Sequence, residues 1–329
     1  MNRISPQTIW LMEEKELVDL LKGDLLHNER RRVCFYAPSF THYRTSSFCS
    51  SPTDFPTISL TGSGCALKCK HCAGTVLNTM HPATTPETLY ELCAKLKEKG
   101  ALGCLLSGGC LPDGSVPVRE FVDTIEKIKY KLELTVIVHT GVIDLQTARA
   151  LKKAGVDAAL IDIIGSDETI KEIYNLNLSA RDYASSLEAL DEADIPFVPH
   201  VIVGLHYGRL KGEFHALEMI SKHSPSALVI IAFMPLHRTE MANVEPPRPI
   251  DITKVLATAR IMFPATPLAL GCMRPKDKHR AEVETLALKA GIDAIAFPSE
   301  KAIKYAEEQG FKISFSSLCC SQVFADLTT

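Results

Sequence analysis

The residues of this sequence best able to do chemistry are three cysteines set close together. Cys65, Cys69 and Cys72 lie in the glycine-flanked segment GSGCALKCKHCAG, with spacings of four and three residues. Thiolates are soft ligands that favour iron–sulfur clusters, zinc or copper(I). Structural zinc normally takes four ligands that arrive as two pairs, and no second pair follows here at zinc-finger spacing. Three ligands to a cubane cluster would leave one iron open to activate a small molecule; a zinc site with a remote fourth ligand is the alternative.

The elements that must position this segment follow a regular alternation of strands and helices. From about residue 57, short apolar runs alternate with amphipathic segments such as PETLYELCAKLKEKG. Apolar runs without clean alternation suit parallel strands that are covered by helices. About eight such repeats predict an α/β fold of the (β/α)8 TIM-barrel type, or a large open fragment of one, over a doubly wound sheet. The expected strands are 57–62, 101–109, 134–141, 156–164, 196–204, 227–235, 267–272 and 291–299.

The domain organisation predicted from these patterns is one barrel with two extensions. Residues 1–56 are expected to form an N-terminal helix and a cysteine-containing loop, 57–310 the barrel, and 311–329 a cysteine-bearing tail that closes it. No Pro/Gly-rich linker divides the barrel. The apolar residues of the expected N-terminal helix recur at near-helical spacing, as Ile9, Met12, Leu17, Leu20 and Leu21.

Composition and charge exclude several classes of function. A formal net charge of -3 over 329 residues indicates neither a nucleic-acid nor a membrane partner. No apolar run approaches the ~18 residues of a membrane-spanning helix, and the acidic residues near the N-terminus argue against a signal peptide. We therefore expect a cytoplasmic protein, in which 11 cysteines are better metal or catalytic candidates than disulfide candidates.

The cysteine pattern resembles a known enzyme family. Cys-x3-Cys-x2-Cys after a first barrel strand, with the ring residue His71 just before the last cysteine, is similar to the signature of radical S-adenosylmethionine (SAM) enzymes. The resemblance implies a 4Fe-4S cluster bound by the three cysteines, whose unique iron chelates SAM. An electron from a donor such as flavodoxin or ferredoxin then releases a 5′-deoxyadenosyl radical, which abstracts hydrogen from unactivated carbon.

Other residues match further parts of the family pattern. Ser107, Gly108 and Gly109 are similar to the glycine motif beside the SAM amino group, where the backbone must approach the ligand closely. Asp162 resembles the polar contact to the ribose hydroxyls. Arg181 lies where biotin-synthase-like members place an arginine near the SAM carboxylate. The alternatives are that Asp162 only caps a loop and that Arg181 is a surface helix residue.

A second set of cysteines lies in the two extensions. Cys34 and Cys49 flank a polar loop before the barrel, and Cys319 and Cys320 lie in the tail. Exposed free thiols would be an oxidation liability, whereas ligation to a shared metal would fix both extensions over the barrel mouth. We therefore expect these four cysteines to hold an auxiliary iron–sulfur cluster; unrelated free thiols are the alternative. Because adjacent cysteines ligate one cluster awkwardly, Cys320 could be replaced by Ser321, Cys110 or Cys272.

A barrel enzyme with a second cluster resembles the sulfur-inserting members of the family, biotin synthase and lipoyl synthase. The C-terminal half is similar to biotin synthase, and Arg274 falls near the cluster-ligating arginine of that enzyme. However, His139 and His200 stand at strand ends where biotin synthase has cysteines, and the N-terminal cysteine set of conventional lipoyl synthase is absent. The cysteine-bearing extensions resemble those of the split lipoyl synthase, in which two biotin-synthase-like proteins act together.

This resemblance implies insertion of sulfur at an unactivated C–H of a protein-bound octanoyl chain, with the auxiliary cluster as sulfur donor. It also implies an octanoylated lipoyl carrier protein and a companion radical SAM subunit as partners. Three alternatives remain open. They are biotin synthase-type sulfur insertion into dethiobiotin, a radical SAM enzyme for another small substrate such as a methylornithine-synthase or hydrogenase-maturation relative, and a zinc- or cluster-carrying scaffold without activity.

Overall fold

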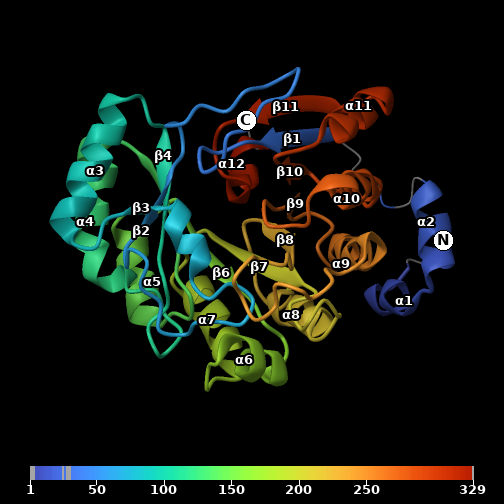
Figure 1. Ribbon diagram of the computed structural model, residues 1–329, viewed down its shortest axis with the longest axis horizontal. Helices are drawn as coiled ribbons and strands as arrows, with labels where there is room; N and C mark the ends of the chain where they lie inside the picture. The colour runs from blue at the N-terminus through green and yellow to red at the C-terminus, as the bar shows by residue number, and fades with distance from the viewer. Residues whose placement is uncertain (1–3, 24–25, 27–30, 328–329) are drawn as a thin grey trace.

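One parallel β-sheet, curled around a central space, organises the chain (Figure 1). This computed structural model describes residues 4–23, 26 and 31–327. The strand order is β11-β1-β10-β9-β8-β7-β6-β5-β4-β2-β3, and every ladder between neighbours is parallel. The strands are β1 Arg32–Tyr36, β2 Thr57–Ser59, β3 His81–Pro82, β4 Gly103–Ser107, β5 Thr135–His139, β6 Ala158–Asp162, β7 Phe197–Val203, β8 Leu228–Ala232, β9 Leu268–Leu270, β10 Ala294–Ala296 and β11 Lys312–Ser316.

The eight strands expected from the sequence are all present, as β2 and β4 to β10. Their parallel order, with helices between them, confirms the predicted α/β fold of the barrel type. The edges of the sheet are β3 and β11, and within the described residues no ladder joins these two strands. The sheet is therefore a curled, open-sided barrel rather than a closed hydrogen-bonded cylinder.

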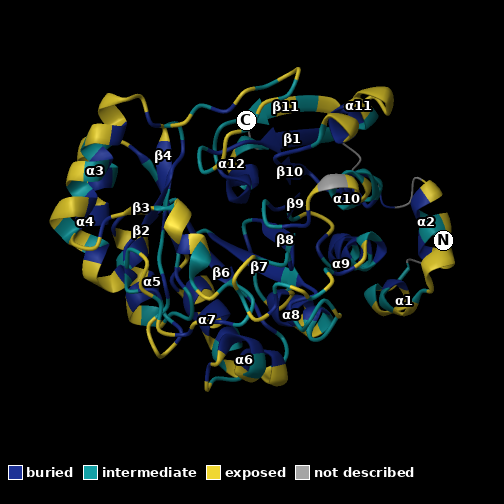
Figure 2. Ribbon diagram, viewed as in Figure 1, coloured by how far each residue is buried: buried dark blue, intermediate teal, exposed yellow. Residues whose placement is uncertain are grey.

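Helices cover the outer face of the sheet and turn their buried sides toward the strands (Figure 2). Gly100, Gly155 and Gly291, with φ of 87°, 81° and 79°, provide the left-handed residue between a helix and the next strand. No helix in the described ranges is long and apolar enough to cross a membrane. The α-helices are α1 Pro6–Leu11, α2 Glu14–Lys22, α3 Pro86–Glu98, α4 Val122–Lys127, α5 Leu145–Lys153, α6 Asp167–Tyr174, α7 Ala180–Glu192, α8 Glu213–Ile220, α9 Pro249–Met262, α10 Asp277–Lys289, α11 Glu300–Glu308 and α12 Val323–Asp326.

The two faces of the sheet pack into two separate apolar clusters. On β5, Val136 and Val138 belong to the cluster under the helices, whereas Ile137 belongs to the cluster inside the curl. The same alternation places Leu160 of β6 and Val198 of β7 inside the curl. Since strand side chains alternate with a period of two, residues two positions further along each strand also face inward. These residues are His139, Asp162 and His200.

Both segments expected as extensions of the barrel contribute to the sheet. β1 lies between β10 and β11, so part of the expected N-terminal loop is a buried strand. The expected N-terminal helix is two short helices, α1 and α2. After β11, the tail forms a 3-10 turn, η5 Cys320–Gln322, and then α12. Because η5 contacts β6, β8, β9 and β10, the tail lies inside the curl of the sheet.

Candidate active site

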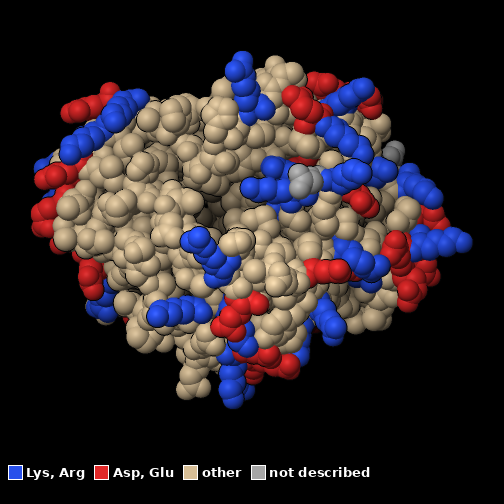
Figure 3. Space-filling view, viewed as in Figure 1, with Lys and Arg blue, Asp and Glu red and all other residues tan. Residues whose placement is uncertain are grey.

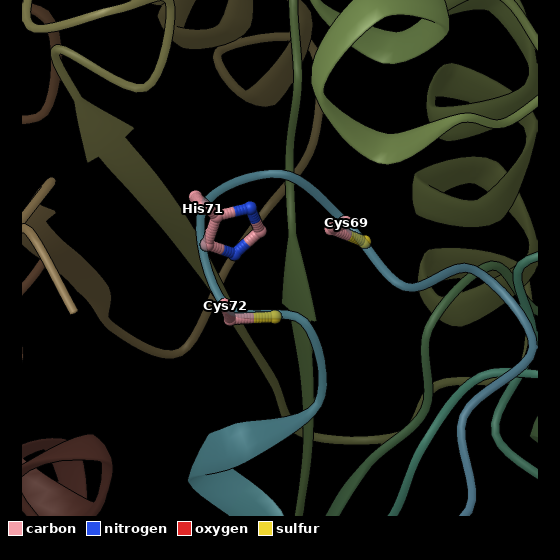
Figure 4. A group of neighbouring side chains, drawn as sticks. All are labelled: Cys69, His71 and Cys72. Atoms are coloured by element: carbon pink, nitrogen blue, oxygen red, sulfur yellow. The ribbon is translucent and has the colours of Figure 1, made fainter. Parts of the chain in front are cut away.

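The cysteine loop follows β2 and is held by hydrogen bonds that it donates to the segment after β4 and to α6. Ala66 N–H donates to the Cys110 carbonyl and Lys70 N–H to the Ile173 carbonyl, each at 2.9 Å. Figure 4 shows Cys69 and Cys72 on one turn of this loop, with the His71 ring close to both. The two sulfur atoms and a ring nitrogen of His71 lie within 4.8 Å of one another. The local sequence therefore brings together two of the three expected thiols and the ring.

The thiols of the cysteine loop interact electrostatically. A hydrogen bond between Cys69 and Cys72, the largest influence on both groups, raises the pKa of Cys69 and lowers that of Cys72, so the thiolate is favoured on Cys72. Burial and then the charges of Cys72 and Cys65 raise the pKa of Cys69 further. Cys65 lies four residues before Cys69 on the same loop, outside the 4.8 Å group. Three thiols on one loop, one of them readily ionised, are a donor set that fits a soft metal cluster.

The glycine motif lies directly against this loop. Gly109 N–H donates to Thr61 Oγ1 at 2.7 Å. A Cβ atom on Gly109 would lie 2.0 Å from the Gly64 carbonyl oxygen and 2.6 Å from Cys65 Cα. On Gly108, the nearest atom to a Cβ would be Thr61 Oγ1, at 3.2 Å. The close approach that requires glycine at position 109 is therefore an approach to the cysteine loop itself.

The end of α6 also positions the cysteine loop, and the sequence analysis missed it. Tyr174 carbonyl accepts a hydrogen bond from Cys69 Sγ at 3.7 Å, and the Tyr174 ring packs on His71 with centroids 5.2 Å apart. Asn175, with φ of 53°, donates from Nδ2 to the Leu67 carbonyl at 3.3 Å. The signal in the sequence was an asparagine at a helix end, a residue that tolerates the left-handed conformation.

The inward-facing residues of β5, β6 and β7 form a polar group inside the curl. His139 Nε2 lies 3.7 Å from Asp162 Oδ1, and one ligand atom of each of these residues and of His200 falls within a 4.8 Å group. Burial first, and then the charge of Asp162, raises the pKa of Tyr183 on α7. Asp162 is therefore an interior residue of the site.

The two arginines expected at the site have different surroundings. Arg181 is exposed at the start of α7 and makes no hydrogen bond or ion pair within the described ranges. Arg274 is 2% exposed, and its guanidinium donates to Glu284 and to the Gly271 and Ala296 carbonyls. These contacts give Arg274 the role of a structural ion-pair partner after β9.

The cysteines of the extensions are only partly brought together. Cys34 lies on β1 with its pKa raised chiefly by burial, and Cys49 is exposed. Cys319 and Cys320 are buried at η5, and Cys272 lies beside them: burial and then the charge of Cys319 raise the pKa of Cys272 to about 11. In the part of the chain that the structure describes, none of the four expected ligands belongs to a group of three metal-binding side chains within 4.8 Å.

Comparisons with known proteins agree with this geometry. Residues 59–208 match the profile of the radical SAM superfamily. A biotin synthase of Leptospira biflexa is 26% identical over 207 residues, which cover 62% of this chain and 57% of that protein. A biotin synthase of Synechococcus elongatus is 26% identical over 301 residues, 88% of each chain.

Among solved structures, the crystal structure of HydG, a maturase of the FeFe-hydrogenase, matches with a TM-score of 0.67. It is 18% identical, and the match covers 99% of this chain and 74% of that chain, so the likeness is one of fold. Together with the three thiols after β2 and the glycine motif packed against them, these matches show that residues 59–208 are similar to the radical SAM superfamily and that the chain is similar to biotin synthases at low identity.

Proposed function

We propose that this protein is a radical SAM sulfurtransferase of the lipoyl synthase type. It inserts sulfur at an unactivated C–H of an octanoyl chain that is bound to a lipoyl carrier protein. The observation that carries the proposal is the position of the tail thiols Cys319 and Cys320, which are buried in the cluster inside the curled sheet that also bears the cysteine loop. A radical formed at the loop and a sulfur source inside the curl would thus lie on one sheet, with the loop thiols packed against the cluster under the helices and the tail thiols in the cluster inside the curl.

Cys65, Cys69 and Cys72 would hold the 4Fe-4S cluster of this enzyme, and their soft donor set fits it. When bound with SAM, that cluster supplies the radical that removes hydrogen from an unreactive carbon. His71 Nδ1 is buried without a hydrogen-bond partner among the described residues, so it is available to a polar group of the cofactor. Ser107 to Gly109 and Asp162 are the proposed contacts to SAM.

The sulfur donor in this proposal is an auxiliary cluster. Cys319 and Cys320 would ligate it together with Cys272, because Cys272 packs against the apolar cluster that contains both tail thiols. Cys34 and Cys49 remain proposed ligands only if the loop between them rearranges, since Cys34 lies on β1 and Cys49 is exposed.

The tail would exclude water during the radical step, because an unprotected radical reacts indiscriminately. Val323, the first residue of α12, is 0% exposed, and Tyr36 Oη donates to Asp326 Oδ2 at 2.5 Å. Figure 3 shows a hollow near the centre of the face around which the sheet curls, with Lys and Arg side chains at its rim over α10. This hollow is the proposed entrance for the acyl chain of the carrier protein.

The proposed partners follow from the reaction. They are the octanoylated lipoyl carrier protein, a companion radical SAM subunit for the second sulfur, and an electron donor such as flavodoxin or ferredoxin.

All 11 cysteines are free, which suits a reducing compartment such as the cytoplasm.

Biotin synthase-type sulfur insertion into dethiobiotin is the second candidate, and the biotin synthases among the relatives favour it. His139 and His200 argue against it, since the resemblance to biotin synthase expects cysteines at these strand ends. Incubation of the anaerobic, cluster-loaded protein with SAM and reductant separates the two candidates. Thiolated octanoyl product on the carrier would support the lipoyl reaction, and biotin formed from dethiobiotin instead would refute it.

Iron and sulfide content tests the cofactors independently of turnover. We expect about two cubane clusters in the native chain and about one in the Cys65→Ala/Cys69→Ala/Cys72→Ala variant, because the two ligand sets are separate. If the triple variant retains no iron, the auxiliary cluster does not exist. A colourless native protein that carries zinc would contradict the radical reaction altogether.

A further inference from the structure

The inward-facing group of two histidines and one aspartate has no part in the reaction proposed above beyond the SAM contact of Asp162. Its members come from three neighbouring strands: His139 ends β5, Asp162 ends β6 and His200 lies within β7. The ladders fix their positions, because Asp162 pairs directly with His200 and His139 pairs with Leu160, two residues before Asp162 on the same face. The rigid sheet, and not a loop, therefore brings the three side chains together.

The ring of His200 is oriented as a metal-binding histidine would be. Its Nδ1 lies 3.1 Å from the Val198 carbonyl oxygen, which can only accept a hydrogen bond. Nδ1 therefore carries the proton, and Nε2 presents its lone pair. A hydrogen bond from one ring nitrogen to a backbone carbonyl is the usual way in which a protein fixes the tautomer of a metal ligand. The partner of Nε2 is Ser321 Oγ at 3.4 Å, close to the limit for a hydrogen bond.

The other two side chains lack strong partners of their own. The ring of His139 makes no hydrogen bond in the described part of the chain, and its contact with Asp162 is 3.7 Å long. Atoms that share one ion at about 2.1 Å lie roughly 3 to 4 Å apart, so this spacing suits two ligands better than a donor and an acceptor. The side chains of His139 and Asp162 are 24% and 29% exposed, which gives an ion a way in.

We propose that His139, Asp162 and His200 bind a divalent transition-metal ion inside the curl of the sheet, at a site separate from the cysteine loop. Two imidazoles and one carboxylate suit zinc or iron(II) and leave coordination positions open. Water or an oxygen atom of a substrate would occupy these positions. The site shares Asp162 with the proposed SAM contacts, but metal binding is measured without turnover, so either proposal can fail without the other.

Cobalt(II) is the probe, because its absorption distinguishes the two kinds of ligand. Cobalt bound by thiolates absorbs strongly in the near ultraviolet through sulfur-to-metal charge transfer, whereas imidazole and carboxylate ligands give only weak visible bands. The full chain carrying Cys65→Ala/Cys69→Ala/Cys72→Ala is titrated anaerobically, so that the strongest thiolate set is absent. We expect one cobalt ion per chain that binds without the charge-transfer absorption.

The variants His139→Gln and His200→Gln, made in that background, should each weaken this binding more than about tenfold, since each removes a ligand. The matched control is His206→Gln. His206 forms a group with Glu168 and Glu172, of which Glu168 is exposed, and this group is the one that an ion bound elsewhere on the molecule would use. The control should leave the affinity unchanged. If His200→Gln does not fold, the cobalt affinity of His139→Gln still tests the proposal. The described structure has no hydrogen bond from the His139 ring that this substitution would break.

Metal-dependent stability gives a second readout. Cobalt should raise the unfolding temperature of the parent protein and of His206→Gln, but not that of His139→Gln, because an ion that binds only the folded state stabilises it. The proposal is overturned if all bound cobalt shows thiolate absorption, if His139→Gln binds as tightly as the parent, or if His206→Gln is the variant that loses the ion.

Discussion

Gly109 shows how a single residue without a side chain can determine the position of reactive thiols. Its backbone N–H binds Thr61 Oγ1, and its Cα faces the backbone of Gly64 and Cys65 at a distance that leaves no room for a Cβ. The cysteine loop and the glycine motif are distant in the sequence, yet their backbones are in direct contact. A change at Gly109 should therefore affect cluster binding through the loop.

We predict that Gly109→Ala destabilises the protein by about 1–3 kcal/mol or more and lowers the iron bound after anaerobic reconstitution. The added Cβ would have to displace Cys65 and the Gly64 carbonyl, and forced overpacking of this kind costs about that much. Gly108→Ala is the matched control, because its nearest contact would be 3.2 Å. Iron content and chemical denaturation measure both effects. Equal iron in the two variants would contradict the prediction.

At the scale of elements, the C-terminal tail is attached to β1, the first strand of the sheet. β1 pairs with β11, and Tyr36 at the end of β1 donates a hydrogen bond to Asp326 in α12. The tail is therefore held by both its backbone and its last helix. The same pairing explains why Cys34 and the tail thiols lie in one apolar cluster.

We predict that Tyr36→Phe loosens α12 and destabilises the protein by about 1.5–3 kcal/mol, the value of a hydrogen bond to a charged group. Limited proteolysis should cut the tail of this variant sooner than that of the native chain. Tyr43→Phe is the control, since Tyr43 Oη donates to the Pro298 carbonyl, away from α12. If the protease cuts the tail at the same rate in the two variants, the Tyr36 contact does not hold α12.

The start of α8 carries a buried carboxyl group with an unusual proton affinity. Burial raises the pKa of Glu213 to about 7, although N–H groups of Gly204 and Lys211 donate to its oxygens. Between pH 4.5 and about 7, the folded state therefore keeps a proton on Glu213 that the unfolded state has lost. The contribution of this group to stability is present below pH 4.5 and is lost as the pH rises to about 7.

We predict that the free energy of unfolding of the native chain, relative to Glu213→Gln, falls by about 3 kcal/mol between pH 4.5 and pH 7 and is constant above. Gln cannot titrate, so subtracting its pH profile removes the contribution of every other group. Denaturant unfolding at a series of pH values measures the difference. A flat or rising difference would mean that the carboxyl group is ionised in the folded protein throughout.

At the scale of the whole molecule, a buried ion-pair network joins the last part of the barrel. Glu284 of α10 is 0% exposed and contacts Arg274 after β9, Arg280 on its own helix, and the N–H of Ser299 after β10. Arg274 in turn donates to carbonyls at the ends of β9 and β10. The network therefore fixes these two strands against their helix, next to Cys272.

We predict that Glu284→Ala destabilises the protein by about 3–5 kcal/mol, because it leaves buried arginine charges without a carboxylate. Glu308→Ala is the control. Its 3.8 Å pair with Lys304 is exposed, so its loss should cost less than about 1 kcal/mol. Denaturant unfolding compares the two variants, and similar losses would contradict the structural role of the network.

Much of the fold and the position of the cysteine loop could be predicted from local sequence patterns. The eight strand repeats follow from runs of apolar residues within single segments, and the cysteine spacing is itself local. The glycine motif was found for the same reason. A hydrophobic period or a cysteine spacing involves only residues close together in the sequence, so it can be recognised without knowledge of long-range contacts.

Only the tertiary structure decided which distant residues meet. β1 joins the sheet through partners more than 250 residues later in the chain, Cys34 opposite Ala294 and Ser314, and no local pattern encodes such a pairing. Local patterns also do not encode the burial of Arg274 or the packing of Cys272 against the cluster that contains Cys319 and Cys320. The meeting of His139, Asp162 and His200 depends on strand register. A shift of one residue would have turned an entire strand to the other face of the sheet.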